Sequence, residues 1–338
     1  MSDFGVQFAD LEEKRIQKRI VQVYSRAQQD IYNKLSGFRS RFAVKDAAKK
    51  AEIAAETDKA AKAVLEKKYK EWLSGKVFIG KQWESKMGEV TKTIVNANAE
   101  AMNIIREGQV SVFATNANYQ AYLLEKGANA SFGFNLYDQK TVTKLLTKHP
   151  TLLPKWKIDE PKDYAWNYGK VQDIVTQAIL QGEGIPEITK HLATDLCTTN
   201  TNRMNTFART SITGAQNAGR IERMQEANDD GIHTKKKWVA TLDSRTRDAH
   251  ADLDGETAEV DEPFKNDIGE IMYPGDPNAD PANVYNCRCA LDYEVVGYEN
   301  HGERRAYKEW DDEDGHHRES YIIEDMTYRE WEKWKEGQ

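Results

Sequence analysis

The sequence predicts an α+β protein: a long helical N-terminal region followed by a small compact α+β domain with a short β-sheet. Two observations predict this fold class. In the first third of the chain, apolar residues recur at steps of three and four, which is the period of one helix face. After Gly231 the pattern changes to short runs rich in Val, Trp and Thr with polar turns between them, which is typical of strands.

The first expected region, residues 1–107, consists of helices with narrow apolar stripes. We expect an interruption at Gly37 and an Ala-, Lys- and Glu-rich helix from Ala47 to Trp72, ending at Ser74–Gly75. The next helix has a four–three spacing over three heptads, which predicts a coiled-coil seam that pairs within this chain or with another. The seam residues are Trp83, Met87, Val90, Ile94, Ala97, Ala101 and Ile104.

Two regions are expected in the middle of the chain. Residues 108–161 predict a loop-rich connector with a short helix from Thr141 to Lys148, because asparagines and glycines interrupt the helical period. Residues 162–230 predict a helical unit, with a short helix after Gly184 and a long one from Asn202 to Asn228. A stripe of small residues on the long helix permits close packing: Ala208, Ser211, Ala215 and Ala218.

The compact domain is expected at residues 231–298. Strands are predicted from Lys236 to Thr241 and from Cys289 to Val296, with a short helix from Thr246 to Leu253 between them. The connection from Glu262 to Asn283 contains four prolines and is long for a loop inside a compact unit. Loops of this length are usually functional or held in place by something.

Charge is distributed unevenly along the chain, whose net charge is −7. Residues 1–70 contain 16 Lys and Arg against 10 Asp and Glu, whereas residues 294–338 contain 14 acidic against 7 basic residues. The basic end suits a nucleic-acid contact and the acidic end, including an expected tail at 299–338 with a last short helix, suits a protein contact. The alternative is that the basic and the acidic residues simply form helix faces exposed to solvent.

Composition excludes several classes of protein. No apolar run approaches the roughly 20 residues of a membrane span, and the N-terminus lacks the pattern of a secretory signal. Three cysteines in 338 residues do not make a disulfide framework, so we expect a reducing cytoplasm as the place of assembly.

The three residues His250, Cys287 and Cys289 predict a zinc site. Thiolate and imidazole are preferred zinc ligands, and the Cys-x-Cys pair follows the histidine by about forty residues within one small domain. A fourth ligand would be Asp243, Asp248, Asp254 or a water molecule. The alternative is that the cysteines are small hydrophobic residues on a strand and that His250 bonds to a carboxylate.

A second cluster, Asp243, Arg245 and Arg247, forms a D-x-R-x-R run. In an enzyme the aspartate would be a general base and the arginines would bind an anion. The alternative, which we favour, is a salt-bridged turn between a strand and a helix. The adjacent His316 and His317 in the acidic tail would bind a metal only weakly.

No other catalytic arrangement is present in the sequence. It contains no Gly-rich phosphate loop, no G-x-S-x-G motif and no H-E-x-x-H motif. The rival function is a zinc-dependent hydrolase or nuclease, in which the histidine and the two cysteines would leave an open position for water. Since no motif fixes a carboxylate beside them, we expect a non-enzymatic function.

The motifs of the compact domain are specific in combination. They comprise Trp238, Asp243, Arg245, Arg247, His250, Asp254, Gly255, Asn286, Cys287, Arg288 and Cys289. With the preceding helices, this set resembles the head-morphogenesis domain of tailed bacteriophages, the minor head protein family that includes phage Mu F. Related sequences place a further histidine before the Cys-x-Cys pair, where this chain has Val284–Tyr285, so the resemblance does not complete a four-ligand site.

The resemblance implies a minor capsid protein of the virion, located near the portal vertex, that acts in head assembly and in DNA packaging or delivery. It implies the portal protein and packaged double-stranded DNA as partners, with the major capsid or scaffold protein as a further candidate. The basic N-terminal helices would then make a non-specific DNA contact. Similar domains also precede effector domains in toxins, but about forty residues follow here, too few for an enzyme.

Overall fold

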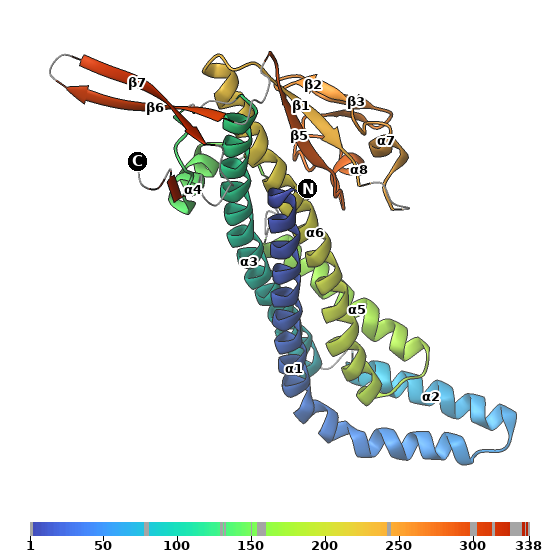
Figure 1. The fold of residues 1–338 in the computed structure, drawn as a ribbon. Coiled ribbons are helices and arrows are strands. Elements are labelled where there is room, and N and C mark those ends of the chain that lie inside the picture. Colours follow the sequence, from blue (N-terminus) through green and yellow to red (C-terminus); the bar gives the residue numbers. More distant parts are fainter. Residues whose placement is uncertain are drawn as a thin grey trace. The chain divides into compact units, whose positions relative to one another are not determined.

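The computed structural model describes residues 3–77, 81–128, 131, 133–149, 151–153, 160–241, 245–297, 303–312, 315–324, 333–334 and 336. The first part of the chain is helical: α1 (Phe4–Ala55), α2 (Lys59–Val77), α3 (Lys81–Gly127), α4 (Gln139–Lys148), α5 (Glu160–Leu180) and α6 (Ile185–Asp229). Short elements follow (Figure 1): β1 (Thr234–Val239), α7 (Asp248–Ala251), β2 (Thr257–Glu259), β3 (Phe264–Asn266), β4 (Gly269–Ile271), α8 (Pro281–Val284), β5 (Ala290–Val295), β6 (Glu303–Asp312) and β7 (Gly315–Glu324). The predicted α+β class is confirmed.

The chain folds into two compact units. One unit comprises Met1–Ile16, Ile105–Lys155 and Thr206–Gln338, and the other comprises Gln17–Ile104 and Trp156–Asn205. The second unit is entirely helical in its described residues, whereas the first contains both helices and all of the described strands.

In the all-helical unit, the predicted seam of α3 is buried by the chain's own helices. Val90 and Ile94 are fully buried, and α1 runs antiparallel beside α3 (Figure 1). The Tyr24 hydroxyl of α1 donates to Asn98, and the Lys34 amine donates to Thr93 Oγ1 at 2.6 Å. The pairing of this seam is therefore intramolecular.

Two helix boundaries differ from the sequence expectation. Helix α1 continues through Gly37, because a single helical glycine costs only about 1 kcal/mol relative to alanine. The break occurs instead inside the helix expected from Ala47 to Trp72. There Asp58 caps α2, its carboxylate accepting a hydrogen bond from the backbone N–H of Ala61 at 2.8 Å. Similarly, α6 is one helix of 45 residues where two were expected.

The expectation of loops from residue 108 onward was wrong for the first twenty residues, which continue α3 to Gly127. The asparagines there are buried and hydrogen-bonded. The Asn116 amide donates to Val112 O at 3.1 Å and to Gly5 O at 3.3 Å. Asn118 bonds both backbone groups of Tyr137, so its side chain anchors the segment before α4. The predicted short helix at 141–148 is confirmed as α4.

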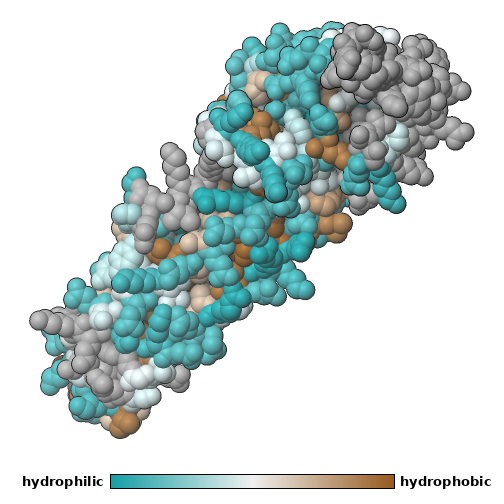
Figure 2. Space-filling view, turned by 90° about the vertical axis from the view of Figure 1, so that its left-hand side faces the viewer, coloured by the Kyte–Doolittle hydropathy of each residue, from teal (hydrophilic) through white to brown (hydrophobic). Residues whose placement is uncertain are grey.

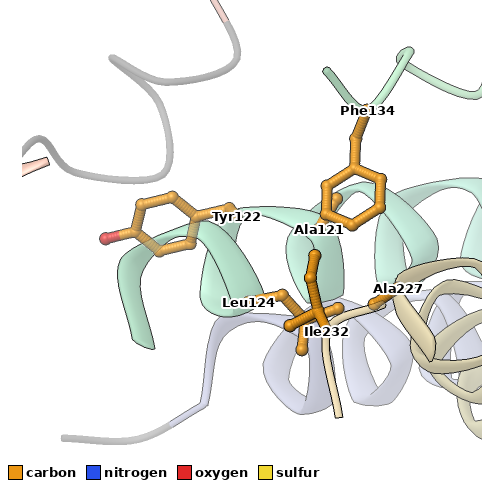
Figure 3. Close-up of a cluster of buried hydrophobic side chains, with 6 residues drawn as sticks. All are labelled: Ala121, Tyr122, Leu124, Phe134, Ala227 and Ile232. Carbon is orange, nitrogen blue, oxygen red and sulfur yellow. The ribbon is translucent and has the colours of Figure 1, made fainter. Parts of the chain in front are cut away.

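Helices α3 and α6 come into close contact in the mixed unit. A Cβ atom placed on Gly219 would lie 2.5 Å from the carbonyl oxygen of Phe113, so only glycine fits between the two backbones. The predicted stripe of small residues on α6 is fully buried. At the end of these helices, apolar side chains form a cluster in which Phe134 and Ile232 face α3 (Figure 3). The cluster is Ala121, Tyr122, Leu124, Phe134, Ala227 and Ile232.

The predicted strands of the compact domain form the three-stranded antiparallel sheet β2-β1-β5. Trp238 of β1 is opposite Leu291 of β5. The connection expected as a loop from Glu262 to Asn283 contains the hairpin β3–β4 and the short helix α8.

The acidic tail also contains regular structure that the sequence analysis did not predict. Strands β6 and β7 pair as an antiparallel hairpin in a tail where the sequence analysis expected only a last short helix. The physical reason is the local composition, because the two strands contain aromatic and β-branched residues, which favour strands: Tyr307, Trp310, Tyr321, Ile322 and Ile323. The side chains of His316 and His317 lie outside the described part of the structure, so weak metal binding there stays a prediction.

Among the described residues, no helix combines the length and the apolar character that crossing a membrane requires. Hydrophilic side chains cover most of the face shown in Figure 2, and apolar ones occur there in small separate patches.

Candidate metal centre

Three elements of the compact domain position the candidate ligands. His250 lies on α7, the single-turn helix that follows β1, and Cys287 and Cys289 lie in the extended segment between α8 and β5. Pairing of β1 with β5 brings these two segments together. All three side chains are buried, with exposed fractions of 1% for His250 and 2% for each cysteine.

The three ligand atoms converge as the sequence predicts. The Nδ1 atom of His250 lies 3.5 Å from Cys287 Sγ and 3.6 Å from Cys289 Sγ. All three atoms lie within 4.8 Å of one another. The backbone N–H of Cys289 also points to Cys287 Sγ at 3.4 Å.

The imidazole of His250 is oriented by a residue that the sequence analysis missed. Its Nε2 atom lies 2.9 Å from Asn283 Oδ1, and Asn283 is fully buried on α8. The amide of Asn266 also donates to Asn283 Oδ1, at 3.1 Å. Since this oxygen can only accept, Nε2 carries the proton and the Nδ1 lone pair faces the two sulfurs. No sequence signal marks Asn283 beyond its position in the proline-rich connection.

Trp238 forms one wall of the site. Its indole is fully buried and meets the rings of His250 and Phe264 edge-on, with ring centroids 5.3 Å apart in each pair. These contacts exclude water from one side of the imidazole and strengthen the electrostatic interactions beside it.

The two thiols share hydrogen bonds, and their pKa values separate as a result. The hydrogen bond from Cys287 lowers the pKa of the Cys289 thiol to about 5 despite its burial. The same pairing with Cys289, together with burial, raises the pKa of Cys287.

The other motif residues around the site have structural roles. Asp254 accepts a hydrogen bond from the backbone N–H of Ala240 at 2.8 Å, and Gly255 donates to Trp238 O at 2.9 Å from a φ of 82°. Arg247 precedes α7, and its guanidinium donates to the carbonyl of Tyr285.

The residues around the cysteine pair attach this segment to its neighbours. Asn286 has a φ of 58° and accepts a hydrogen bond from Arg209 of α6 at 3.4 Å. The carbonyl of Arg288 accepts from the Thr241 hydroxyl at 3.0 Å. Arg245 is exposed. Asp243 lies outside the described residues, so its two candidate roles, general base or member of a salt-bridged turn, remain predictions.

Two of the candidates for a fourth ligand, Asp248 and Asp254, are not part of the cluster. Within the described part of the chain, the group that could hold a metal comprises only the histidine and the two cysteines. Asp248 and Asp254 are exposed, and Asp254 bonds the backbone instead.

Known proteins are similar to this chain in a segment that includes the candidate metal centre. Residues 169–292 match the family described as "Phage Mu protein F like protein", a segment that runs from within α5 to β5. The chain is 28% identical over 257 residues to the "Minor head protein GP7" of Bacillus phage SPP1, covering 75% of this chain and 79% of that protein. The chain is therefore similar to phage minor head proteins, both in its matched segment and over most of its length.

Two further relatives match over shorter segments. The "Uncharacterized protein YqbB" of Bacillus subtilis (strain 168) is 31% identical over 125 residues, which are 36% of this chain and 40% of that protein. The "NAD(+)--arginine ADP-ribosyltransferase EFV" of Enterococcus faecalis (strain ATCC 700802 / V583) is 43% identical over 58 residues, which are 17% of this chain and 12% of that enzyme. No solved structure matches the chain significantly.

Proposed function

We propose that this protein is a minor head protein of a tailed phage, a non-catalytic assembly component at the portal vertex that acts in head assembly and in DNA packaging or delivery. The observation that carries the proposal is the similarity to the SPP1 minor head protein, which extends over three quarters of the chain. Assembly in the host cytoplasm, and contact with the major capsid or scaffold protein, belong to the same proposal.

The burial of the metal-type cluster supports a structural role over a catalytic one. His250, Cys287 and Cys289 are at most 2% exposed, so a substrate would have no access to them without rearrangement. A zinc hydrolase also needs a general acid or base, and no carboxylate joins the cluster among the described residues. Zinc-dependent cleavage of DNA, protein or cell wall that His250→Ala abolished would contradict the proposal.

The helical unit offers exposed apolar side chains that suit a protein contact. Val44 of α1 is 77% exposed and Val64 of α2 is 52% exposed. Both lie on helices with many lysines, so an acidic protein surface would be complementary to them.

Co-expression with the portal protein of the same phage tests the proposed partner. We expect the two proteins to co-purify, and we expect Val44→Asp with Val64→Asp to weaken the association while the circular dichroism spectrum stays unchanged. The matched control is Val239→Asp, at a β1 residue that is 40% exposed, which should leave the association intact. Absence of co-purification with a folded wild-type protein would refute the portal contact.

A further inference from the structure

We propose that His250, Cys287 and Cys289 bind one structural Zn²⁺ ion, with solvent in the fourth position. This inference is independent of the portal and DNA roles proposed above.

The spacing of the three ligand atoms fits a tetrahedral zinc ion. With Zn–S of about 2.3 Å and Zn–N of about 2.0–2.1 Å, a tetrahedral angle places sulfur and nitrogen about 3.6 Å apart. The separations of 3.5 and 3.6 Å between His250 Nδ1 and the two sulfurs agree with this edge length. Both nitrogen–sulfur edges therefore fit a bound ion, and all three ligand atoms lie within 4.8 Å of one another.

The surroundings also fit those of a metal ligand. Histidines that bind metals usually donate their other ring N–H to a carbonyl or carboxylate, which fixes the ring. Here His250 Nε2–H donates to Asn283 Oδ1, and Asn266 bonds that same oxygen. The Nδ1 lone pair is thus directed between the sulfurs by Asn283, whose side chain Asn266 holds in place.

Simple packing of two neutral thiols accounts less well for the arrangement. Nδ1 can accept only one hydrogen bond, yet both sulfurs lie at nearly equal distances from it. The backbone N–H of Cys289 also points to Cys287 Sγ, and a neutral thiol is a weak acceptor for such a bond. A metal-bound thiolate would satisfy both observations.

A bound ion would hold together segments that are separate in sequence. It would join α7 to the segment before β5, and Asn283 would extend this connection to α8. The proline-rich connection between α7 and β5 would then be fixed at both ends. Metal binding and stability of this domain should be linked.

Zinc analysis of the purified full-length protein tests the proposal. After incubation with Zn²⁺ and a non-chelating reductant, followed by dialysis, we expect about one zinc per chain by mass spectrometry. Cys287→Ser, Cys289→Ser and His250→Ala should each lose most of it. Cys197→Ser is the matched control, because Cys197 is also a buried free thiol but lies on α6 outside the cluster. It should retain the zinc.

Two measurements on the wild-type protein do not depend on whether the variants fold. Cobalt substitution should give the intense visible bands and thiolate charge-transfer band of a tetrahedral site, and zinc should bleach them. A chelator should lower the melting temperature, and added zinc should restore it. Wild-type protein that binds neither metal and melts at one temperature throughout would overturn the proposal, as would equal zinc loss in Cys197→Ser and Cys289→Ser.

Discussion

Asn217 of α6 shows how much one polar side chain contributes to the mixed unit. Its amide donates to Thr213 O at 2.9 Å, to Pro274 O at 3.1 Å and to Cys289 O at 3.3 Å, and its Oδ1 accepts from the backbone N–H of Leu291 at 2.8 Å. This fully buried asparagine therefore joins α6 to the proline-rich connection and to β5.

Replacing Asn217 with alanine should lower the free energy of unfolding by about 2–4 kcal/mol, because buried backbone groups would lose their hydrogen-bond partners. Chemical denaturation monitored by circular dichroism measures the change. Asn103→Ala, on an exposed position of α3, is the control and should stay within about 0.5 kcal/mol of the wild type. A similar small effect for both variants would show that the Asn217 network is not needed.

Lys236 of β1 is a buried cation that, among the described residues, has no carboxylate within hydrogen-bond distance. Its amine donates to Val260 O at 3.1 Å and to Met272 O at 2.9 Å, and it lies 5.2 Å from the centroid of the Phe264 ring. Burial lowers the pKa of Lys236 from 10.5 to about 8, although the charge of Asp261 opposes this shift.

This lysine should make stability depend on pH. Below pH 8 the amine is protonated in both states, whereas between pH 8 and 10.5 the folded protein has released a proton that the unfolded chain still binds. The free energy of unfolding attributable to Lys236 therefore rises with pH across this window. The difference between wild type and Lys236→Met should increase from pH 8 to pH 10.5 in denaturation curves.

The control for this titration is Lys237→Met, which removes the neighbouring, half-exposed lysine on the other face of β1. Parallel pH curves for wild type and Lys236→Met would contradict the assigned titration. At every pH, Lys236→Met should also be less stable than wild type, because each unpaired buried carbonyl costs about 1–3 kcal/mol.

At the scale of elements, two helical glycines have opposite roles. Gly219 lies where the backbones of α3 and α6 meet, whereas nothing lies within 4 Å of a Cβ placed on Gly37 of α1. Helix propensity alone would favour alanine at both positions, so only the tertiary contact distinguishes them.

Alanine substitution of the two glycines should therefore change stability in opposite directions. Gly37→Ala should raise the free energy of unfolding by about 0.5–1 kcal/mol through helix propensity. Gly219→Ala should lower it by about 1–3 kcal/mol, since the new methyl group would force α3 and α6 apart. Thermal denaturation of both variants measures this. A stabilised Gly219→Ala would mean that the two helices do not meet closely there.

The burial of the α3 seam also affects how partner binding can be tested. Val90 and Ile94 are fully buried within the chain, so charged substitutions there should unfold the helical unit. Exposed residues such as Val44 and Val64 are the appropriate positions for testing an intermolecular contact.

For the molecule as a whole, the basic N-terminal helices are the proposed site of DNA contact. Helix α2 contains six lysines and two glutamates, and Lys59, Lys67 and Lys68 are exposed. Deleting residues 1–70 would remove buried residues of α1 such as Ile20, so surface substitutions are the cleaner experiment.

The triple substitution of Lys59, Lys67 and Lys68 with glutamine should weaken non-specific DNA binding. It should also make the salt dependence shallower, by about 0.9 in slope for each DNA phosphate that the variant no longer neutralises. The matched control replaces Lys140, Lys144 and Lys148, three exposed lysines of α4, and should bind like wild type. Fluorescence anisotropy at several salt concentrations measures the binding. If both triple variants bind DNA equally weakly, the DNA site lies elsewhere or the effect reflects net charge alone.

The sequence by itself determined the features that depend on local periodicity and composition. The α3 seam, the small-residue stripe of α6 and the strands β1 and β5 are predicted by residue spacing, because one buried face imposes its period on the side chains. The convergence of His250 with Cys287 and Cys289 was also predictable, since scarce ligand-type residues were confined to one small domain.

Only the tertiary structure decided which groups face one another across the fold. No sequence pattern indicates that Asn283 orients His250, that Asn217 joins α6 to β5, or that Lys236 is buried. Local patterns also misplace helix breaks, because a glycine or asparagine that interrupts an isolated helix is tolerated when packing or hydrogen bonds compensate, as at Asn116. Such partners lie far apart in the chain, and their pairing depends on packing that local sequence patterns do not encode.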